Sequence, residues 1–326
     1  MTVILGPVEA RAEIAFLEAF ERELRRLLRS DVEFIQLIED DLVYAGGKRV
    51  RPQLVHLASR TLHPDGVPHE MRLALAVELL HSATLLHDDL VDGAETRRGR
   101  EAAYRRYGNA VSVLSGDYLL SRLLYSLAET GRMELVYLFA EVARELSEAE
   151  VLQFQAAAYG EYREDLYFRI IRGKTAALMQ AATEGAAVLF GLAPEHPWRR
   201  ALVEFGEAYG LAFQMRDDYL DLMGDPERLG KPVGGDVREG KVTLILLRLL
   251  AHAPEEVEEI LVRRGAQEGD IERLRDLAET TGVAREVVAR IAREVARAEA
   301  ALEVLPPGPA REKLAELARK ELGRLG

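Results

Sequence analysis

The pattern Asp-Asp-x-x-Asp occurs twice, at residues 88–92 and at residues 217–221. Each copy closes a long, mostly apolar segment of helical period. Side chains four positions apart share a helix face, so the first and last aspartates of each copy point the same way. The C-terminal end of a helix disfavours carboxylates. Carboxylate pairs in that position predict a compensating hard cation such as Mg²⁺, which binds carboxylate oxygens and recruits phosphate oxygens.

A single acidic cluster at a helix end is more often a solvated surface than a metal site. The second copy has the same spacing and the same apolar lead-in, and this recurrence favours two sites that face each other across one cavity. Such a pair is able to hold several Mg²⁺ ions around a diphosphate and orient it as a leaving group.

Basic residues lie next to both clusters. Lys48, Arg49 and Arg51 follow a double glycine, and Arg97 and Arg98 follow the first cluster. After the second cluster, Lys231 and Lys241 repeat the arrangement. Arginine binds phosphate oxygens in bidentate fashion, and lysine adds a point charge. Any one of these groups alone would be read as solvated charge, but together they predict an anionic substrate bridged by cations. No Walker A pattern occurs, which excludes a P-loop nucleotide site.

Composition narrows the class of protein. The chain has 326 residues, a net charge of −12 and no cysteine, so disulfides and thiolate metal sites are excluded. The negative charge argues against nonspecific nucleic-acid binding. We find neither a signal sequence nor an apolar run long enough to span a membrane, and we therefore expect a cytoplasmic protein.

Nearly every segment has helical period, which predicts an all-α fold in a single domain over residues 1–326. The segment 68–92 is apolar almost all round and should be a central, buried helix. Further helices are predicted over 163–190 and 198–222, the second carrying the second cluster. Residues 224–240 contain five glycines and two prolines in 17 residues, and we predict a long functional loop there.

Seven blocks between residues 45 and 245 occur in an order that resembles the trans-isoprenyl diphosphate synthases, in particular the long-chain octaprenyl and heptaprenyl type. They are Gly47–Pro52, Glu78–Asp92, Arg97–Gly99, Gly116-Asp117, Gly173–Thr175, Phe213–Asp221 and Gly230–Lys241. The resemblance implies a helical bundle around a deep cavity (the isoprenoid synthase fold), usually a homodimer. It also implies prenyltransferase activity on allylic and isopentenyl diphosphates, about three Mg²⁺ ions with substrate bound, and transient membrane contact during product release.

The resemblance also implies residue roles. The Mg²⁺ ligands would be Asp88, Asp92 and Asp217, with Asp89, Asp218 and Asp221 nearby or acting through water. The diphosphate of isopentenyl diphosphate would be bound by Lys48, Arg51, His81 and Arg98, and the allylic diphosphate by Arg97, Lys174, Lys231 and Lys241. Thr175 and Gln214 would place oxygens near the developing carbocation. The sequence departs from the family pattern at Gly235, where an acidic residue is common, and in the absence of a proline near Thr243.

Product length should depend on the layers beneath the first cluster. Because one helical turn rises about 5.4 Å, Thr84 and Ala83 form the layer below Asp88, with Leu80 beneath them. These turns contain no aromatic residue, and the family resemblance implies that a small residue at the Ala83 position is typical of the long-chain type. We therefore predict a product of about C35 to C45, with C40 favoured. Phe139, on a neighbouring helix, is the candidate for the pocket floor.

Several alternatives stay open on the sequence. A short-chain geranylgeranyl or farnesyl diphosphate synthase differs only in product, and a non-catalytic helical subunit of a heteromeric synthase would tend to lose the aspartates. A terpene cyclase normally has a second metal site of different composition. His81, Thr175 and Gln214 each also have a purely structural interpretation as hydrogen-bonded polar groups within helices.

Overall fold

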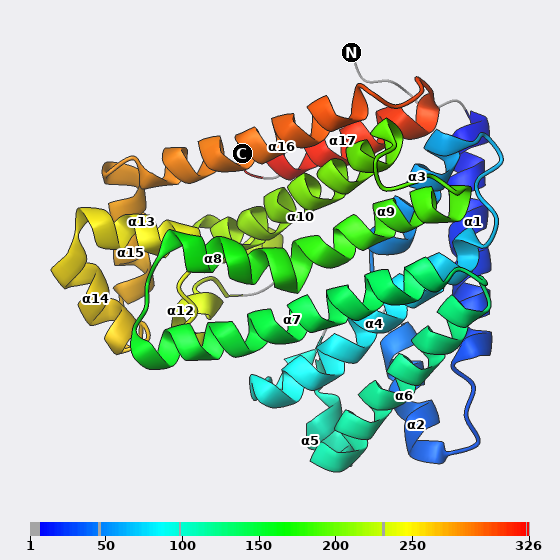
Figure 1. The fold of residues 1–326 in the computed structure, drawn as a ribbon. Coiled ribbons are helices and arrows are strands. Elements are labelled where there is room, and N and C mark those ends of the chain that lie inside the picture. The colour runs from blue at the N-terminus through cyan, green and yellow to red at the C-terminus, as the bar shows by residue number, and fades with distance from the viewer. Residues whose placement is uncertain (1–6, 45–46, 98, 230–231, 324, 326) are drawn as a thin grey trace. The chain divides into compact units, whose positions relative to one another are not determined.

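The computed structural model describes residues 7–44, 47–97, 99–229, 232–323 and 325, and the predicted all-α fold is confirmed (Figure 1). The chain begins with α1 (Pro7–Leu27), α2 (Glu33–Tyr44), α3 (Val50–Leu62) and α4 (Glu70–Val91), and α4 carries the first cluster. Next come α5 (Ala103–Tyr107), α6 (Asn109–Ala128), α7 (Met133–Tyr159), α8 (Glu164–Ile171), the π-helical turn η1 (Arg172–Ala176), α9 (Ala177–Phe190) and α10 (Pro197–Met223). The last are α11 (Pro226–Leu229), α12 (Gly235–Glu239), α13 (Leu244–His252), α14 (Pro254–Val262), α15 (Asp270–Thr280), α16 (Val283–Leu302) and α17 (Pro309–Gly323).

The chain forms two compact units, and helices α7, α9, α10 and α17 contribute residues to both. Unit 1 comprises Met1–Glu141, Ala181–Leu202 and Val304–Leu314, and unit 2 comprises Val142–Gln180, Val203–Glu303 and Ala315–Gly326. The single domain over residues 1–326 stays a prediction. No helix in the described part of the chain is both long and apolar enough to cross a membrane, and the cytoplasmic location stays a prediction.

Helix α4 is the centre of unit 1, as its apolar sequence predicts. It packs against both α3 and α6, and a continuous run from Leu73 to Leu80 is buried. Burying an aliphatic side chain stabilises the folded state by about 1.5–3 kcal/mol, so this run holds α4 in place and thereby fixes the position of its last turn. That last turn carries the first acidic cluster.

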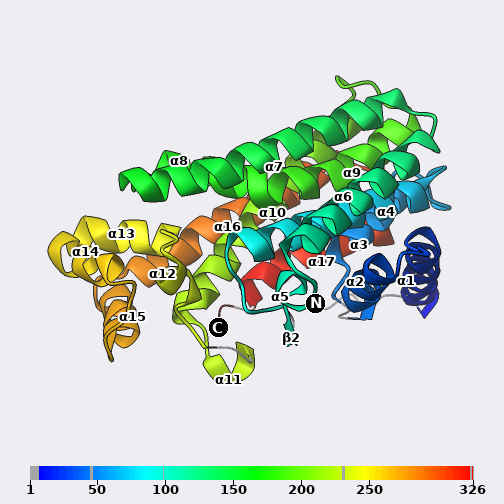
Figure 2. The same ribbon diagram turned by 90° about the horizontal axis from the view of Figure 1, so that it is seen from below.

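In unit 2, the helices that follow the second cluster pack on one another. Helix α13 contacts α8, α14, α15 and α16 (Figure 2). Arg275 of α15 donates hydrogen bonds to the carbonyls of Leu222 (3.0 Å) and Gly224 (2.9 Å) at the end of α10. The last carbonyls of a helix have no partner within it, so this arginine closes α10 just beyond the second cluster.

Two local predictions need correction, and the segment after the first cluster contains a short element that was not predicted. The helix expected over 163–190 is interrupted at η1, where π-helical geometry inserts an extra residue into the helix. The segment 224–240 is not without regular structure, because it contains α11 and α12. The polar loop after the first cluster forms a short antiparallel hairpin of β1 (Thr96–Arg97) and β2 (Arg100–Glu101).

Candidate active site

The first acidic cluster lies at the C-terminal end of α4 in unit 1. Asp88 and Asp89 belong to the helix, and Asp92 is its C-cap residue, whose backbone N–H donates to the carbonyl of Asp88 (2.7 Å). Asp89 is buried and accepts a hydrogen bond from Nε of Arg97 (2.9 Å), which reaches back from β1. The hairpin therefore brings Arg97 onto the first cluster.

A small cavity beside this cluster brings together one residue predicted to bind isopentenyl diphosphate, His81, and one predicted to bind the allylic diphosphate, Arg97. His81, Asp89 and Arg97 line it, together with Arg49 and Arg100. Lys48 and Arg51 are absent from its lining, and Arg98 lies outside the described residues. The structure thus brings His81 and Arg97 together in unit 1.

Arg49 is a structural residue, although it belongs to the basic motif. Its guanidinium is buried and is held by Glu21 (Nε to Oε1, 2.6 Å) and by Glu78 (Nη1 to Oε1, 2.5 Å). Its backbone has φ +47°, a left-handed conformation that is uncommon outside glycine. These two carboxylates hold the turn that leads into α3.

In unit 2, the turn η1 presents Lys174 and Thr175. Lys174 Nζ pairs with Oε1 of Glu150 (2.6 Å) and donates to Oε1 of Gln153 (3.2 Å). The hydroxyl of Thr175 donates to Oε1 of Gln214 on α10 (2.6 Å) rather than to its own preceding turn. Because π-bulges occur frequently at functional sites, the interruption at these two residues agrees with their predicted role.

The second cluster lies at the end of α10, and each carboxylate has a different partner. Asp218 is buried and accepts hydrogen bonds from the hydroxyl of Tyr167 (2.6 Å) and from Nε2 of Gln214 (2.7 Å). Asp221 accepts one from the backbone N–H of Asp236 (2.8 Å). The side chain of Asp217 is 47% exposed and pairs with Arg216.

The electrostatics of this cluster indicate excess negative charge. Burial, together with the neighbouring Asp217 and Asp221, raises the pKa of Asp218 to about 6 despite the donors on its oxygens. Burial and the carboxylates of Asp218 and Asp221 raise the pKa of Asp236 to about 8. Nearby carboxylates that disfavour one another's charge are a feature of sites that bind a cation.

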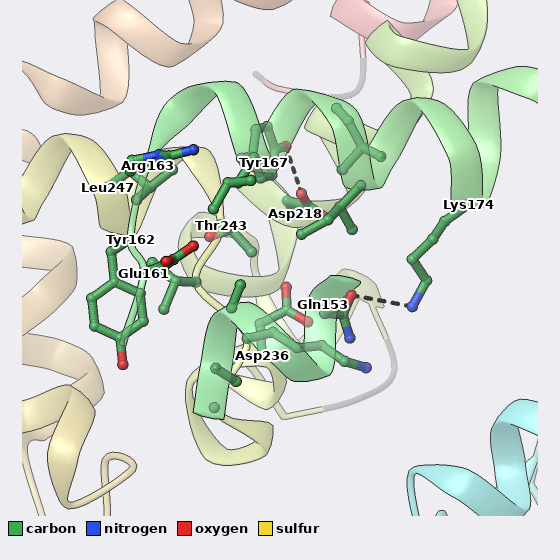
Figure 3. A pocket seen from close by; sticks show the side chains of 18 of the residues that line it. Gln153, Glu161, Tyr162, Arg163, Tyr167, Lys174, Asp218, Asp236, Thr243 and Leu247 are labelled. Atoms are coloured by element: carbon green, nitrogen blue, oxygen red, sulfur yellow. Dashed lines mark hydrogen bonds between the residues drawn. The ribbon is translucent and has the colours of Figure 1, made fainter. Parts of the chain in front are cut away.

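One cavity of about 160 Å³ combines these groups (Figure 3). Lys174 and Lys241 line it together with Asp218, Asp236 and Gln214. Figure 3 shows Tyr167 hydrogen-bonded to Asp218, and Gln153 to Lys174. Cationic and anionic side chains therefore line the same cavity. Lys231 lies outside the described residues.

The carboxylates of the two acidic clusters are hard oxygen ligands of the kind that Mg²⁺ binds. In the described part of the chain, no three acidic or histidine side chains converge on one point. Mg²⁺ is usually held by one or two carboxylates, with water and phosphate oxygens completing its shell, so a ready-made protein cage is not required. The first cluster belongs to unit 1 and the second to unit 2. Their opposition across one cavity stays a prediction.

Two cavity residues that contact the second cluster, Asp236 and Tyr167, were not predicted from the sequence. Asp236 lies in the glycine-rich segment five residues before Lys241, and Tyr167 lies on α8 before η1. Asp236 could have been found, because a glycine pair comes directly before it in a segment that the sequence analysis considered functional. Nothing local marks Tyr167, because its contact with Asp218 joins residues that are far apart in the sequence.

The polyprenyl synthetase family model matches residues 32–278, most of the chain. The chain belongs to the polyprenyl synthetase family. An all-trans-nonaprenyl-diphosphate synthase (geranyl-diphosphate specific) of Rhodobacter capsulatus is 37% identical over 324 residues, covering 99% of this chain and 97% of that protein. The octaprenyl diphosphate synthase of Escherichia coli K12 is 37% identical over 296 residues, covering 89% and 90%. The crystal structure of a polyprenyl synthase from Caulobacter crescentus CB15, complexed with calcium and isoprenyl diphosphate, matches with TM-score 0.89 and 38% identity over 97% of each chain.

Family membership confirms the resemblance and identifies the chain as a prenyltransferase. The residues predicted to set product length lie in unit 1. Ala83, Leu80 and Phe139 are buried, and Thr84 is half-buried with its hydroxyl donating to the carbonyl of His81 (2.8 Å). The hydroxyl of Thr84 is thus satisfied by its own helix. The role of these residues in setting product length stays a prediction.

Proposed function

We propose that this family member is an Mg²⁺-dependent head-to-tail trans-prenyltransferase. It would condense an allylic diphosphate with successive isopentenyl diphosphates to an all-trans product of about C35 to C45, with C40 favoured. The observation that carries this proposal is the cavity of unit 2, where Lys174 and Lys241 share the lining with Asp218 and Asp236. A diphosphate with bound divalent cations is the ligand that satisfies both signs of charge.

The basic residues would bind the leaving group. Lys174 is presented by η1 and Lys241 by the segment after α12, so both ammonium groups reach one cavity from different elements. As the carbon–oxygen bond of the allylic diphosphate breaks, negative charge builds on the diphosphate oxygens. Preorganised lysines stabilise that charge without reorganising at the moment of reaction. Mg²⁺ held by the aspartates would supply further stabilisation of the same charge.

The uncharged polar residues would hold the reacting end of the substrate. Thr175 and Gln214 are hydrogen-bonded to each other, and Gln214 is fixed in turn by Asp218. Their oxygens would face the allylic cation as it forms. The terminal alkene carbon of isopentenyl diphosphate then forms the new carbon–carbon bond, and a proton is lost to the departing diphosphate. Apolar neighbours such as Leu166 and Ile170 line the same cavity and would exclude water, which would otherwise trap the cation.

Isopentenyl diphosphate would be bound in unit 1 by Lys48, Arg51, His81 and Arg98, and Arg97 of the same unit would bind the allylic diphosphate. His81 and Arg97 line one cavity there, and Lys48 and Arg51 flank the buried anchor Arg49. The buried pairs of Arg49 fix the backbone between Lys48 and Arg51. Arginine and lysine on a fixed turn bind a diphosphate at low entropic cost.

A long product agrees with the small side chains below Asp88 and with the names of the nonaprenyl and octaprenyl relatives. A long allylic chain would pass this layer, where an aromatic ring would block it. Chromatography of the product separates this outcome from a C15 or C20 product.

A homodimer would cover apolar side chains that unit 1 exposes. On α6, Leu114 is 62% and Tyr125 is 52% exposed, and on the first turns of α7, Tyr137 is 71% exposed. Leu124 and Met133 are also more than half exposed. Single exposed apolar side chains are normal at a surface, whereas several on two consecutive helices favour a protein partner. A second copy of the chain is the partner that the family resemblance implies.

The decisive experiment incubates the protein with farnesyl and isopentenyl diphosphates and Mg²⁺, and identifies the products by mass spectrometry. We expect a ladder ending near C40, loss of turnover with excess chelator, and recovery when Mg²⁺ is restored. Asp218→Asn should reduce kcat/KM by a factor of about 100 or more. Asp225→Asn, an aspartate that is half-exposed in the loop after the cluster, is the matched control and should retain activity. No condensation by folded, metal-supplied protein would refute the proposal.

A further inference from the structure

A buried ion pair joins the second acidic cluster to the C-terminal helix. Arg216 precedes Asp217 directly, and its guanidinium donates from Nε to Oδ1 of Asp217 (3.0 Å). Its Nη1 pairs with Oε2 of Glu321 on α17. The side chains of Arg216 and Glu321 are only 4% and 3% exposed. All three residues belong to unit 2.

Further contacts hold this pair in place. The hydroxyl of Tyr209 donates to the other carboxylate oxygen of Glu321 (3.2 Å), and the guanidinium carbon of Arg216 lies 4.4 Å from the ring centroid of Phe213. Tyr209 and Phe213 precede Arg216 on α10, at intervals of three to four residues. One face of α10 therefore packs the aromatic rings and the arginine against Glu321.

The charges of this arrangement matter for a cation at Asp217. An arginine bonded to a carboxylate cancels its negative charge and disfavours a metal ion there. Glu321 supplies a second negative charge on the opposite side of the guanidinium. The Arg216–Glu321 pair is then neutral, so Asp217 is oriented by Arg216 and keeps its own charge for a cation.

We propose that Glu321 is a positioning residue for the second metal site: it holds and neutralises Arg216, which in turn orients Asp217. This inference rests on the proposed function, because it takes Asp217 to be a metal ligand. Partners of this kind, behind the ligands themselves, typically change metal affinity by a factor of about 10 to 100 when they are removed. The C-terminal helix is thereby part of the second metal site, although none of its residues is expected to touch metal or substrate.

The test measures binding of Mn²⁺ in the presence of inorganic diphosphate, by electron paramagnetic resonance and by calorimetry, without turnover. Glu321→Gln keeps the shape of the side chain and a hydrogen-bond acceptor for Tyr209 but removes the charge. We expect its dissociation constant for Mn²⁺ to rise by about tenfold. The matched control is Glu299→Gln, which breaks the exposed pair that Arg319 of α17 makes with α16 (2.8 Å), and it should bind as the wild type does.

A double variant separates the charge effect from a packing defect. In Arg216→Gln/Glu321→Gln both charges are removed, so no uncompensated cation lies next to Asp217. We expect it to bind Mn²⁺ more tightly than Glu321→Gln alone, because the excess positive charge has been removed. A general loosening of α17 would weaken the double variant at least as much as the single one.

The outcomes discriminate clearly. Weak binding by Glu321→Gln with recovery in the double variant supports the proposal. Wild-type affinity in Glu321→Gln, or a double variant that binds Mn²⁺ no more tightly than Glu321→Gln, overturns it while the proposed function stands. If the wild type does not bind Mn²⁺ with diphosphate, the metal site and the role of Glu321 are both refuted. If Glu321→Gln does not fold, the affinity of the double variant still decides, since a value far below that of the wild type contradicts the proposal.

Discussion

The substitution Gly210→Ala tests whether the turn η1 must be held in place for catalysis. Gly210 lies on α10 against Ala176, the last residue of η1. A Cβ atom at Gly210 would lie 2.5 Å from Cα and 2.9 Å from Cβ of Ala176. The first of these contacts is with backbone, which cannot rotate away as a flexible side chain would.

The size of the effect follows from these distances. To restore an ordinary contact of 3.4 Å, the turn and α10 must separate by about 0.9 Å. Gly173, in the same turn, is packed as closely against α7, where its own Cβ would lie 2.7 Å from the carbonyl oxygen of Glu145. The turn has little room to yield on that side. Thr175 is the neighbour of Ala176, so its 2.6 Å hydrogen bond to Gln214 must lengthen.

A misplacement of about 1 Å costs on the order of 100-fold in rate. We therefore expect Gly210→Ala to lower kcat/KM by about two orders of magnitude. Overpacking destabilises by about 1–3 kcal/mol, so the melting temperature should fall by only several degrees and the protein should stay folded in the assay.

The matched control for this experiment is Gly185→Ala in α9 of unit 1. Its added Cβ would also be crowded, at 2.8 Å from the terminal methyls of Leu73. Those methyls belong to a flexible side chain in a region away from η1. We expect a loss of stability with kcat/KM near the wild-type value, measured by steady-state incorporation of labelled isopentenyl diphosphate. Full kcat/KM in Gly210→Ala would refute the requirement for a fixed turn.

Three further predictions follow. Ala83→Tyr should shorten the product to about C15 to C20, because an aromatic ring one turn below Asp88 closes the pocket; an unchanged product in the mass spectrum would refute this placement. Glu207→Gln should lower the melting temperature at pH 7 by about 2–4 °C, since Arg172 and Arg297 lower the pKa of Glu207 against the opposing effect of its burial. A lowered pKa gives stability that is present above the unfolded-state pKa and is lost as the pH falls through the folded-state pKa. The difference in melting temperature between the variant and the wild type should therefore shrink below about pH 4. An equal difference at pH 7 and below about pH 4 would exclude the ionic explanation. Leu114→Glu should convert dimer to monomer in light scattering, whereas Val262→Glu, at a position 79% exposed in unit 2, should not; an unchanged mass for the first variant would contradict the proposed interface.

Much of the fold could be predicted because it depends on local pattern. The run before Asp88 is apolar on all sides, and a helix of that kind is stable only in the interior, where α4 lies. The spacing of both acidic clusters depends on helical geometry alone, so their position at the ends of α4 and α10 followed from the sequence. The polyprenyl synthetase motifs added the roles, but the roles of individual residues stay predictions.

The remaining features depend on contacts between distant segments or on very short elements. The bond between Tyr167 and Asp218 joins α8 to α10, and no periodicity in either helix indicates it. Helices α11 and α12 contain four and five residues, too few to show a helical period in a segment rich in glycine. The π-helical turn is closely packed at Gly173 against α7 and at Ala176 against Gly210 of α10, and these contacts become visible only when α7 and α10 are in place.

The aspartates of the second cluster are held in orientation by different kinds of partner. A carboxylate that is to bind a cation must be held in a fixed orientation, yet a basic partner that holds it also cancels its charge. Asp218 is held by the neutral donors of Tyr167 and Gln214, and Asp221 by a backbone N–H. Among the contacts described for this cluster, Asp217 is held by Arg216, and Glu321 balances the charge of that arginine. Asp89 of the first cluster contrasts with all of these, because Arg97 holds it with no second carboxylate among the contacts described for that arginine. Arg97 therefore offsets the charge of Asp89, which disfavours a cation bound directly to this carboxylate.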